Sequence, residues 1–139
     1  MQHSTVQGSL AMSLVVSPEL SFRVVVELGY DPADPYAVRF TFHLPGDDPV
    51  TWVFARELLL DGIGRPSGEG DVHIRPVGGE LTEVCIVLHS PAGEALLRAS
   101  APPLIAFLAR TDRLVPMGQE LTGGELDAQL ADILRGCER

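Results

Sequence analysis

The sequence predicts an α+β protein in which an antiparallel sheet of about seven strands is accompanied by one short helix and two longer ones. Apolar and polar residues alternate through much of the first half of the chain, which is typical of half-buried strands. Proline- and glycine-rich turns separate these runs, and apolar residues at helical spacing are concentrated in the last third. With 139 residues, of which 45% are hydrophobic, the chain fits one domain over residues 1–139.

Four strands are expected in the first half. The first is an apolar, β-tolerant run that Pro18 ends. In the next two, every second residue is apolar or aromatic, as the sequence Phe22, Val24, Val26 illustrates. A turn at residues 45–49, PGDDP, precedes the fourth strand. The expected strands cover residues 5–17, 22–30, 36–44 and 50–54.

The hydrophobic period changes at Ala55. Residues 56–61 are rich in helix formers, and Gly62 and Gly64 are expected to end this short helix. Residues 65–70 are expected to form a loop without regular structure. Three further strands follow, and Pro91 suits the first central position of the turn that joins the last two. They cover residues 71–77, 81–90 and 94–99.

The two longer helices are expected in the last third. Two prolines at residues 102–103 are tolerated only in a first helical turn, and Leu104, Phe107 and Leu108 then form an apolar stripe. That helix is expected to end near residue 112. A second stripe, which predicts the final helix, consists of Leu126, Leu130, Ile133 and Leu134.

The composition argues against catalysis and against binding of nucleic acids. All ten basic residues are arginines, so no lysine is present for a phosphate-binding loop, a Schiff base or a general base. The four histidines, His3, His43, His73 and His89, lie on separate segments without the spacing of metal ligands. A formal net charge of −9 opposes binding to a phosphate backbone. The sequence therefore predicts no enzyme, no cofactor and no metal site.

The cysteines and the absence of a membrane span or a signal peptide in the sequence predict a cytosolic protein. Cys85 lies inside an apolar run and is expected to be a small core residue rather than a disulfide partner or a nucleophile. No window approaches the roughly 18 uninterrupted apolar residues of a membrane span. The first residues also lack the charged region of a signal peptide.

Four features are candidates for binding a partner. Residues 58–60 are three consecutive leucines in a short helix, so Leu60 either reaches the surface or is covered by a loop. Val115, Pro116, Met117 and Gly118 form an apolar tip, for which burial under the sheet is an equal alternative. The last helix carries acids around its apolar stripe and suits a basic partner, or packs on its own sheet or a sister subunit. Exposed sheet edges are the fourth candidate, because they often pair symmetrically.

Five ordered blocks of the sequence resemble one known family. They are residues 30–38 (YDPADPYAV), 52–59 (WVFARELL), 70–72 (GDV), 90–97 (SPAGEALL) and 107–112 (FLARTD). These blocks are similar to those of the SsgA-like proteins of sporulating actinobacteria. The resemblance implies a strongly bent sheet of Whirly-like fold, a homotrimer and no enzymatic activity.

The resemblance also implies a function in cell division. Members of this family help to place the division machinery, notably FtsZ, at septa, so we expect a non-enzymatic adaptor in the cytoplasm at the septum. Its partners would be FtsZ and other division proteins, and it would meet the membrane only through them. The alternative hypothesis is binding of single-stranded nucleic acid, as in Whirly-like proteins, against which the negative charge counts. A third class of function, a partner of the transcription machinery, is supported by no motif.

Overall fold

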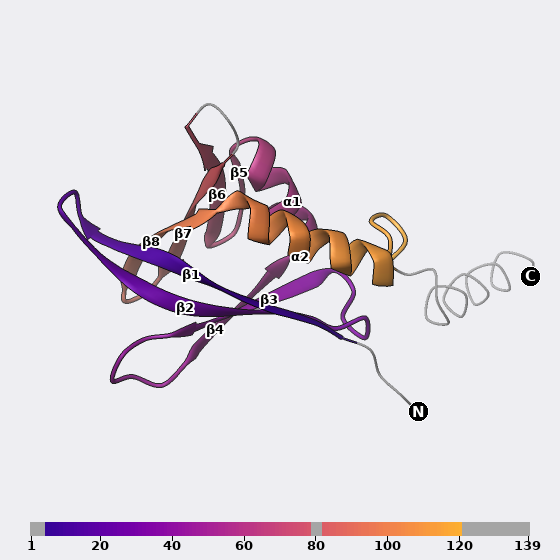
Figure 1. Cartoon of the computed structure of the whole chain (residues 1–139), viewed down its shortest axis with the longest axis horizontal. Coiled ribbons are helices and arrows are strands. Elements are labelled where there is room, and N and C mark those ends of the chain that lie inside the picture. The colour runs from indigo at the N-terminus through magenta and orange to yellow at the C-terminus, as the bar shows by residue number, and fades with distance from the viewer. Residues whose placement is uncertain (1–4, 79–81, 121–139) are drawn as a thin grey trace, which may run out of the picture.

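A computed structural model describes residues 5–78 and 82–120 of the chain. In this part an antiparallel sheet of eight strands is curled into a half-barrel, and two helices lie against it (Figure 1). The predicted α+β class and the antiparallel sheet are confirmed. The strands are β1 (Val6–Ser17), β2 (Leu20–Tyr30), β3 (Ala37–His43), β4 (Val50–Ala55), β5 (Ser67–Glu69), β6 (Val72–Val77), β7 (Glu83–Ser90) and β8 (Gly93–Ser100). The helices are α1 (Arg56–Gly64) and α2 (Ala101–Leu114).

The sheet consists of two meanders that meet at one seam. The strand order is β4-β3-β2-β1-β8-β7-β6-β5, so every pairing except β1 with β8 joins strands that are neighbours in sequence. The seam is short, because β1 and β8 pair only through Ser13 with Arg98, Leu14 with Leu97 and Val15 with Leu96. The two meanders therefore share a narrow line of backbone hydrogen bonds.

The prediction of about seven strands was one strand too low. The segment expected to be a loop contains β5, which pairs with β6 through Ser67 with Ile74 and Glu69 with Val72. A tight turn containing Gly70, at a φ of 60°, joins the two strands. Three residues are too few to display an alternating pattern, which is why this edge strand was not visible in the sequence.

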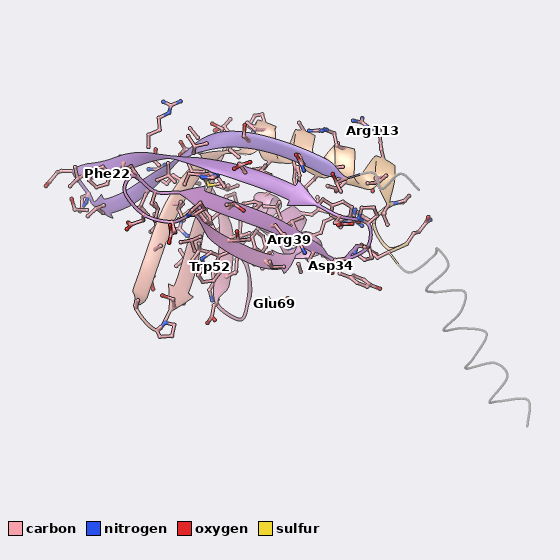
Figure 2. The ribbon with its side chains drawn as sticks, turned by 90° about the horizontal axis from the view of Figure 1, so that it is seen from below. Phe22, Asp34, Arg39, Trp52, Glu69 and Arg113 are labelled. Atoms are coloured by element: carbon pink, nitrogen blue, oxygen red, sulfur yellow. The ribbon has the colours of Figure 1, made fainter. Side chains whose placement is uncertain are left out.

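The hydrophobic core lies on the concave face of the sheet. Val26, Val38 and Phe40 are completely buried there, which confirms the predicted alternation in β2 and β3. Leu104, Phe107 and Leu108 of α2 pack into the same core, as their helical spacing predicted. Phe22 differs from the buried members of its pattern, since it is 51% exposed near the tip of the β1–β2 hairpin, away from α2 (Figure 2).

Helix α1 continues past Gly62, the first of the two glycines expected to end it, and ends at the second. Gly62 is buried in the helix, and a Cβ atom there would lie 2.4 Å from Cβ of Ile74 on β6. The glycine thus permits close packing of α1 on the sheet, and the helix ends at Gly64. The predicted final helix, with Leu126, Leu130, Ile133 and Leu134, lies outside the described residues.

Candidate partner-binding surface

Arg56, the first residue of α1, is a completely buried charged side chain. Its backbone N–H donates to the carbonyl of Tyr36 at 2.7 Å, which fixes the start of the helix beside β3. Its guanidinium donates from Nη1 to the carbonyl of Val115 at 2.7 Å and, at 3.4 Å, to Oγ1 of Thr111. Nη2 donates to Oε2 of Glu120 at 2.7 Å. Nε is buried without a hydrogen-bond partner within the described ranges.

Tyr30, the last residue of β2, lies against the same guanidinium. The Cζ atom of Arg56 is 4.9 Å from the centre of the tyrosine ring, which is the geometry of a cation–π contact. The Tyr30 hydroxyl donates to the carbonyl of Pro35 at 2.9 Å. Arg56 therefore connects the Asp-Pro loop after β2 with the end of α2 and with the segment that follows it.

The charge of Arg56 affects the pKa of two neighbouring side chains. Burial raises the pKa of Glu120, but the hydrogen bond from Arg56 and the nearby positive charge outweigh it, so the pKa is lowered. Burial raises the pKa of Tyr30, and the positive charge of Arg56 opposes that shift without cancelling it. Only 8% of the Glu120 side chain is exposed, so this ion pair is largely shielded from solvent. We call the group of Tyr30, Arg56, Thr111 and Glu120 the clamp.

The clamp holds the apolar tip after α2. Val115 is half-buried and packs against the core, whereas Pro116 and Gly118 are exposed and Met117 is partly exposed. The Met117 N–H donates to Oδ1 of Asp112 at 2.9 Å, and the Gln119 N–H donates to the carbonyl of Pro116 at 2.9 Å. Gly118 has a φ of 85°, as expected for a glycine that ends such a turn. The tip is therefore a defined turn with an exposed edge.

Leu60 lies one helical turn after Arg56 on α1. Leu58 and Leu59 are buried, whereas Leu60 is 44% exposed. The sequence had predicted that one helix face could not accommodate all three leucines, and the structure leaves the third at the surface. Because residues four apart share a helix face, Leu60 extends the side of α1 that carries Arg56. We call Leu60 together with residues 115–118 the clamp-end surface.

The clamp was not predicted from the sequence. A signal was present, since Arg56, Leu59 and Ile63 follow the i, i+3, i+7 spacing of a buried helix stripe. An arginine in such a stripe is either buried with a partner or extends to the surface. Its partner Glu120 is distant in sequence, so the pairing had no local signature.

The described residues contain no group of three or more His, Cys, Asp or Glu side chains placed to hold a metal ion. His73 is exposed on β6, and His89 on β7 pairs through Nδ1 with Glu94 at 3.1 Å. Cys85 is a buried free cysteine, as predicted. Within residues 5–78 and 82–120, no helix has the length and apolar character needed to cross a membrane.

A comparison with known families decides what this chain is related to. The sequence profile described as "Streptomyces sporulation and cell division protein, SsgA" matches residues 24–120. The chain belongs to the SsgA family. This confirms the resemblance seen in the five sequence blocks, which all lie between residues 30 and 112.

Two relatives of this chain within the SsgA family are both named SsgB. The chain is 50% identical over 133 residues to the sporulation-specific cell division protein SsgB of Streptomyces coelicolor, covering 95% of this chain and 97% of the relative. It is 41% identical over 138 residues to SsgB of Frankia casuarinae, covering 97% and 95%. The sequence blocks resembled most the branch of the family typified by SsgB, in agreement with these names.

Two solved structures of the SsgA family have the same fold. One comes from work on SsgB mutations and longitudinal cell division during sporulation of Streptomyces coelicolor. It matches with a TM-score of 0.80 at 51% identity, over 85% of this chain and 94% of that one. The other is an SsgA-like sporulation-specific cell division protein from Thermobifida fusca, with a TM-score of 0.82 at 42% identity, over 94% and 96%. The chain is thus a member of a sporulation and cell-division family.

Proposed function

We propose that this chain is a non-enzymatic adaptor of sporulation septation that recruits or organises FtsZ through its clamp-end surface. The clamp carries this proposal. A buried ion pair and a cation–π contact hold an otherwise exposed turn in one conformation, and Leu60 is exposed on the helix that carries Arg56. Pre-organisation of this kind reduces the entropy lost on binding, which favours a docking role for the tip over a catalytic one.

We also propose where the protein acts in the cell and which oligomer it forms. The adaptor acts in the cytoplasm at the septum, meets the membrane only through its partners, and assembles as a homotrimer. Among the described residues β4 and β5 end the sheet, and edge strands often pair between copies. Light scattering coupled to size-exclusion chromatography measures the mass. A monomer at the concentrations used for binding contradicts the trimer.

Co-sedimentation with FtsZ filaments tests the adaptor function. The wild-type chain is expected in the pellet only when FtsZ is polymerised. Leu60→Asp and Met117→Asp place a charge on the clamp-end surface, and each is expected to weaken co-sedimentation by about tenfold or more, as loss of an interface anchor does. Neither side chain is fully buried, so the fold is expected to persist.

Val25→Asp is the matched control for these variants. Val25 is as exposed as Leu60, but its neighbours Val24 and Val26 are buried, so it lies on the opposite, convex face of the sheet. This variant is expected to co-sediment like the wild type. Absence of wild-type binding would contradict the adaptor function. Equal loss in Leu60→Asp and Val25→Asp would contradict the assignment to the clamp end.

The alternative function, binding of single-stranded nucleic acid by a Whirly-like fold, has less support. Such sites combine a cationic groove with aromatic side chains on which bases stack. On the concave side, Phe42 and Trp52 line a groove whose lining includes Glu94 and no arginine, so these aromatic residues do not lie in a cationic groove. A titration with a fluorescent oligonucleotide at low salt is expected to show no saturable binding. Binding that weakens steeply with salt would support the alternative.

A further inference from the structure

A second surface lies at the other end of the molecule, where the half-barrel opens. An apolar groove of about 340 Å³ separates the β3–β4 hairpin from the β7–β8 hairpin on the concave side. Its walls come from both meanders, since Phe42 and Trp52 lie on one side and Leu88 and Leu97 on the other, with Leu14 of β1 between them. We call this feature the open-end groove.

The open-end groove continues into apolar side chains that the fold leaves uncovered. Val50 lines the groove and is 43% exposed at the start of β4. Phe22 pairs with Leu14 across β1 and β2, so its exposed ring extends the same concave face beyond the groove. Figure 2 shows Phe22 at the opposite end of the molecule from Arg113, which lies in the last turn of α2. No residue of α1 or α2 lines the groove.

One carboxylate lines this apolar opening, and two more lie in the turn between two of its lining residues. Asp47 and Asp48 lie in the exposed turn between Leu44 and Val50, both of which line the groove. Glu94 lines the opposite wall and remains more than half exposed while it pairs with His89. The lining contains no arginine and no histidine. An apolar groove with an acidic rim favours an apolar segment flanked by positive charges.

Charge also disfavours the chain's own residues 121–139 as the segment that occupies the groove. Residues 121–139 contain four carboxylates, Glu125, Asp127, Asp132 and Glu138, against two arginines, Arg135 and Arg139. This segment would bring like charge to the acidic rim, whether it came from the same chain or from another copy. Two open ends facing each other would do the same. Like-charge juxtaposition disfavours such pairings.

We propose that the open-end groove binds a short segment of a different protein, in which one or two large apolar side chains are flanked by arginine or lysine. The apolar side chains enter between Trp52 and Leu97, and the flanking cations meet Asp47, Asp48 and Glu94. This site goes beyond the proposed FtsZ contact, because it lies at the opposite end and recognises a different chemistry.

Selection from a displayed library of random, tryptophan-free peptides on the full-length protein tests the proposal. Peptides that also bind a Val50→Asp variant are removed by counter-selection. The recovered peptides are expected to share a large apolar residue with arginine or lysine on one or both sides. No enrichment, or enrichment of acidic peptides, overturns the proposal.

Trp52 then reports binding directly, because it is the only tryptophan in the chain and lines the groove. A selected peptide is expected to shift the Trp52 emission to shorter wavelength with saturation. Val50→Asp, at a partly exposed position, is expected to weaken binding by at least about tenfold. Leu60→Asp, at the clamp end, is the matched control and is expected to leave the titration unchanged. An unchanged titration with Val50→Asp overturns the assignment.

The rim is tested by a variant that cannot disturb the core. Asp47→Asn with Asp48→Asn removes two exposed charges from a turn, and it is expected to weaken binding about threefold to tenfold at low salt. The two proteins are expected to converge at high salt, where screening removes the attraction. Equal affinity at low salt overturns the role of the rim. A change of oligomeric mass with Val50→Asp, without any peptide binding, identifies a second copy as the occupant and overturns the proposal.

Discussion

Arg56 links three segments of the chain through one buried guanidinium. It contacts Tyr30 at the end of β2, Thr111 in α2 and Glu120 beyond the tip. A buried ion pair contributes little net stability compared with an apolar substitute, but its loss is costly when one charge remains without a partner. The clamp therefore determines where the tip lies more than it determines how stable the whole molecule is.

Replacement of Glu120 alone is expected to show the cost of leaving the buried charge of Arg56 without a charged partner. Glu120→Gln leaves the buried charge of Arg56 with a neutral partner, and we expect the free energy of unfolding to fall by about 3 kcal/mol. Glu69→Gln, at an exposed position on β5, is the control and is expected to stay within about 0.5 kcal/mol of the wild type. Urea denaturation measures both. Equal midpoints for the two variants would contradict a buried pair.

The pH dependence of stability gives an independent check on the same residue. The pKa of Glu120 is lower in the folded chain than in the unfolded chain, so its contribution is present above the unfolded value of about 4.3. It is lost as the pH falls through the lower, folded value. The wild type is therefore expected to lose more stability than Glu120→Gln in acid. Melting temperatures measured by circular dichroism that fall in parallel would contradict the linkage.

At the scale of elements, two glycines of α1 have opposite roles. Gly62→Ala would place a Cβ atom 2.4 Å from Cβ of Ile74, so overpacking is expected to cost about 1–3 kcal/mol. Gly64→Ala meets no atom within 4 Å and restricts the unfolded chain, so it is expected to stabilise by about 0.4–1 kcal/mol. Thermal denaturation distinguishes the two. Stabilisation by both substitutions would contradict the close packing of α1 on β6.

The same elements explain what could be predicted from the sequence. Long strands such as β2 and β3 were visible because one face of each is buried, which imposes a period of two. The strand β5 was missed because its three residues are held by pairing with β6 rather than by burial. Gly64 ends α1 as predicted, whereas Gly62 was wrongly included in the stop because it serves packing.

The candidate site was also predicted only in part from the sequence. Leu60 was singled out because one helix face cannot take three consecutive leucines, and the tip because its proline, methionine and glycine indicate a rigid apolar turn. The clamp was not identified, because the contact of Arg56 with Glu120 arises only from tertiary structure. The assignment of these residues to a partner stays a prediction, as does the single domain over residues 1–139.

At the scale of the whole molecule, the two proposed surfaces lie at opposite ends. The end of α2 and the Asp-Pro loop are at one end, the tips of the β1–β2, β3–β4 and β7–β8 hairpins are at the other, and α1 lies between them (Figure 1). A molecule with this arrangement can connect two partners without competition between them. It would act as a bridge rather than as a switch.

Beads that carry a peptide selected for the open-end groove test the bridge. They are expected to retain FtsZ filaments only when this chain is added. Val50→Asp and Leu60→Asp should each abolish retention, for different reasons, whereas Val25→Asp should leave it unchanged. Retention by a protein that carries both substitutions would contradict the two-ended arrangement.

The short seam between β1 and β8 has a kinetic consequence. Each meander closes short loops, whereas the seam must join strands from distant parts of the chain, and that closure carries a larger entropic cost. We therefore expect Leu97→Ala, at the seam, to slow refolding, and Val72→Ala, in a peripheral hairpin, mainly to accelerate unfolding. Stopped-flow measurements across denaturant concentrations separate these effects. The last event of folding would then be the joining of two preformed halves along three residue pairs.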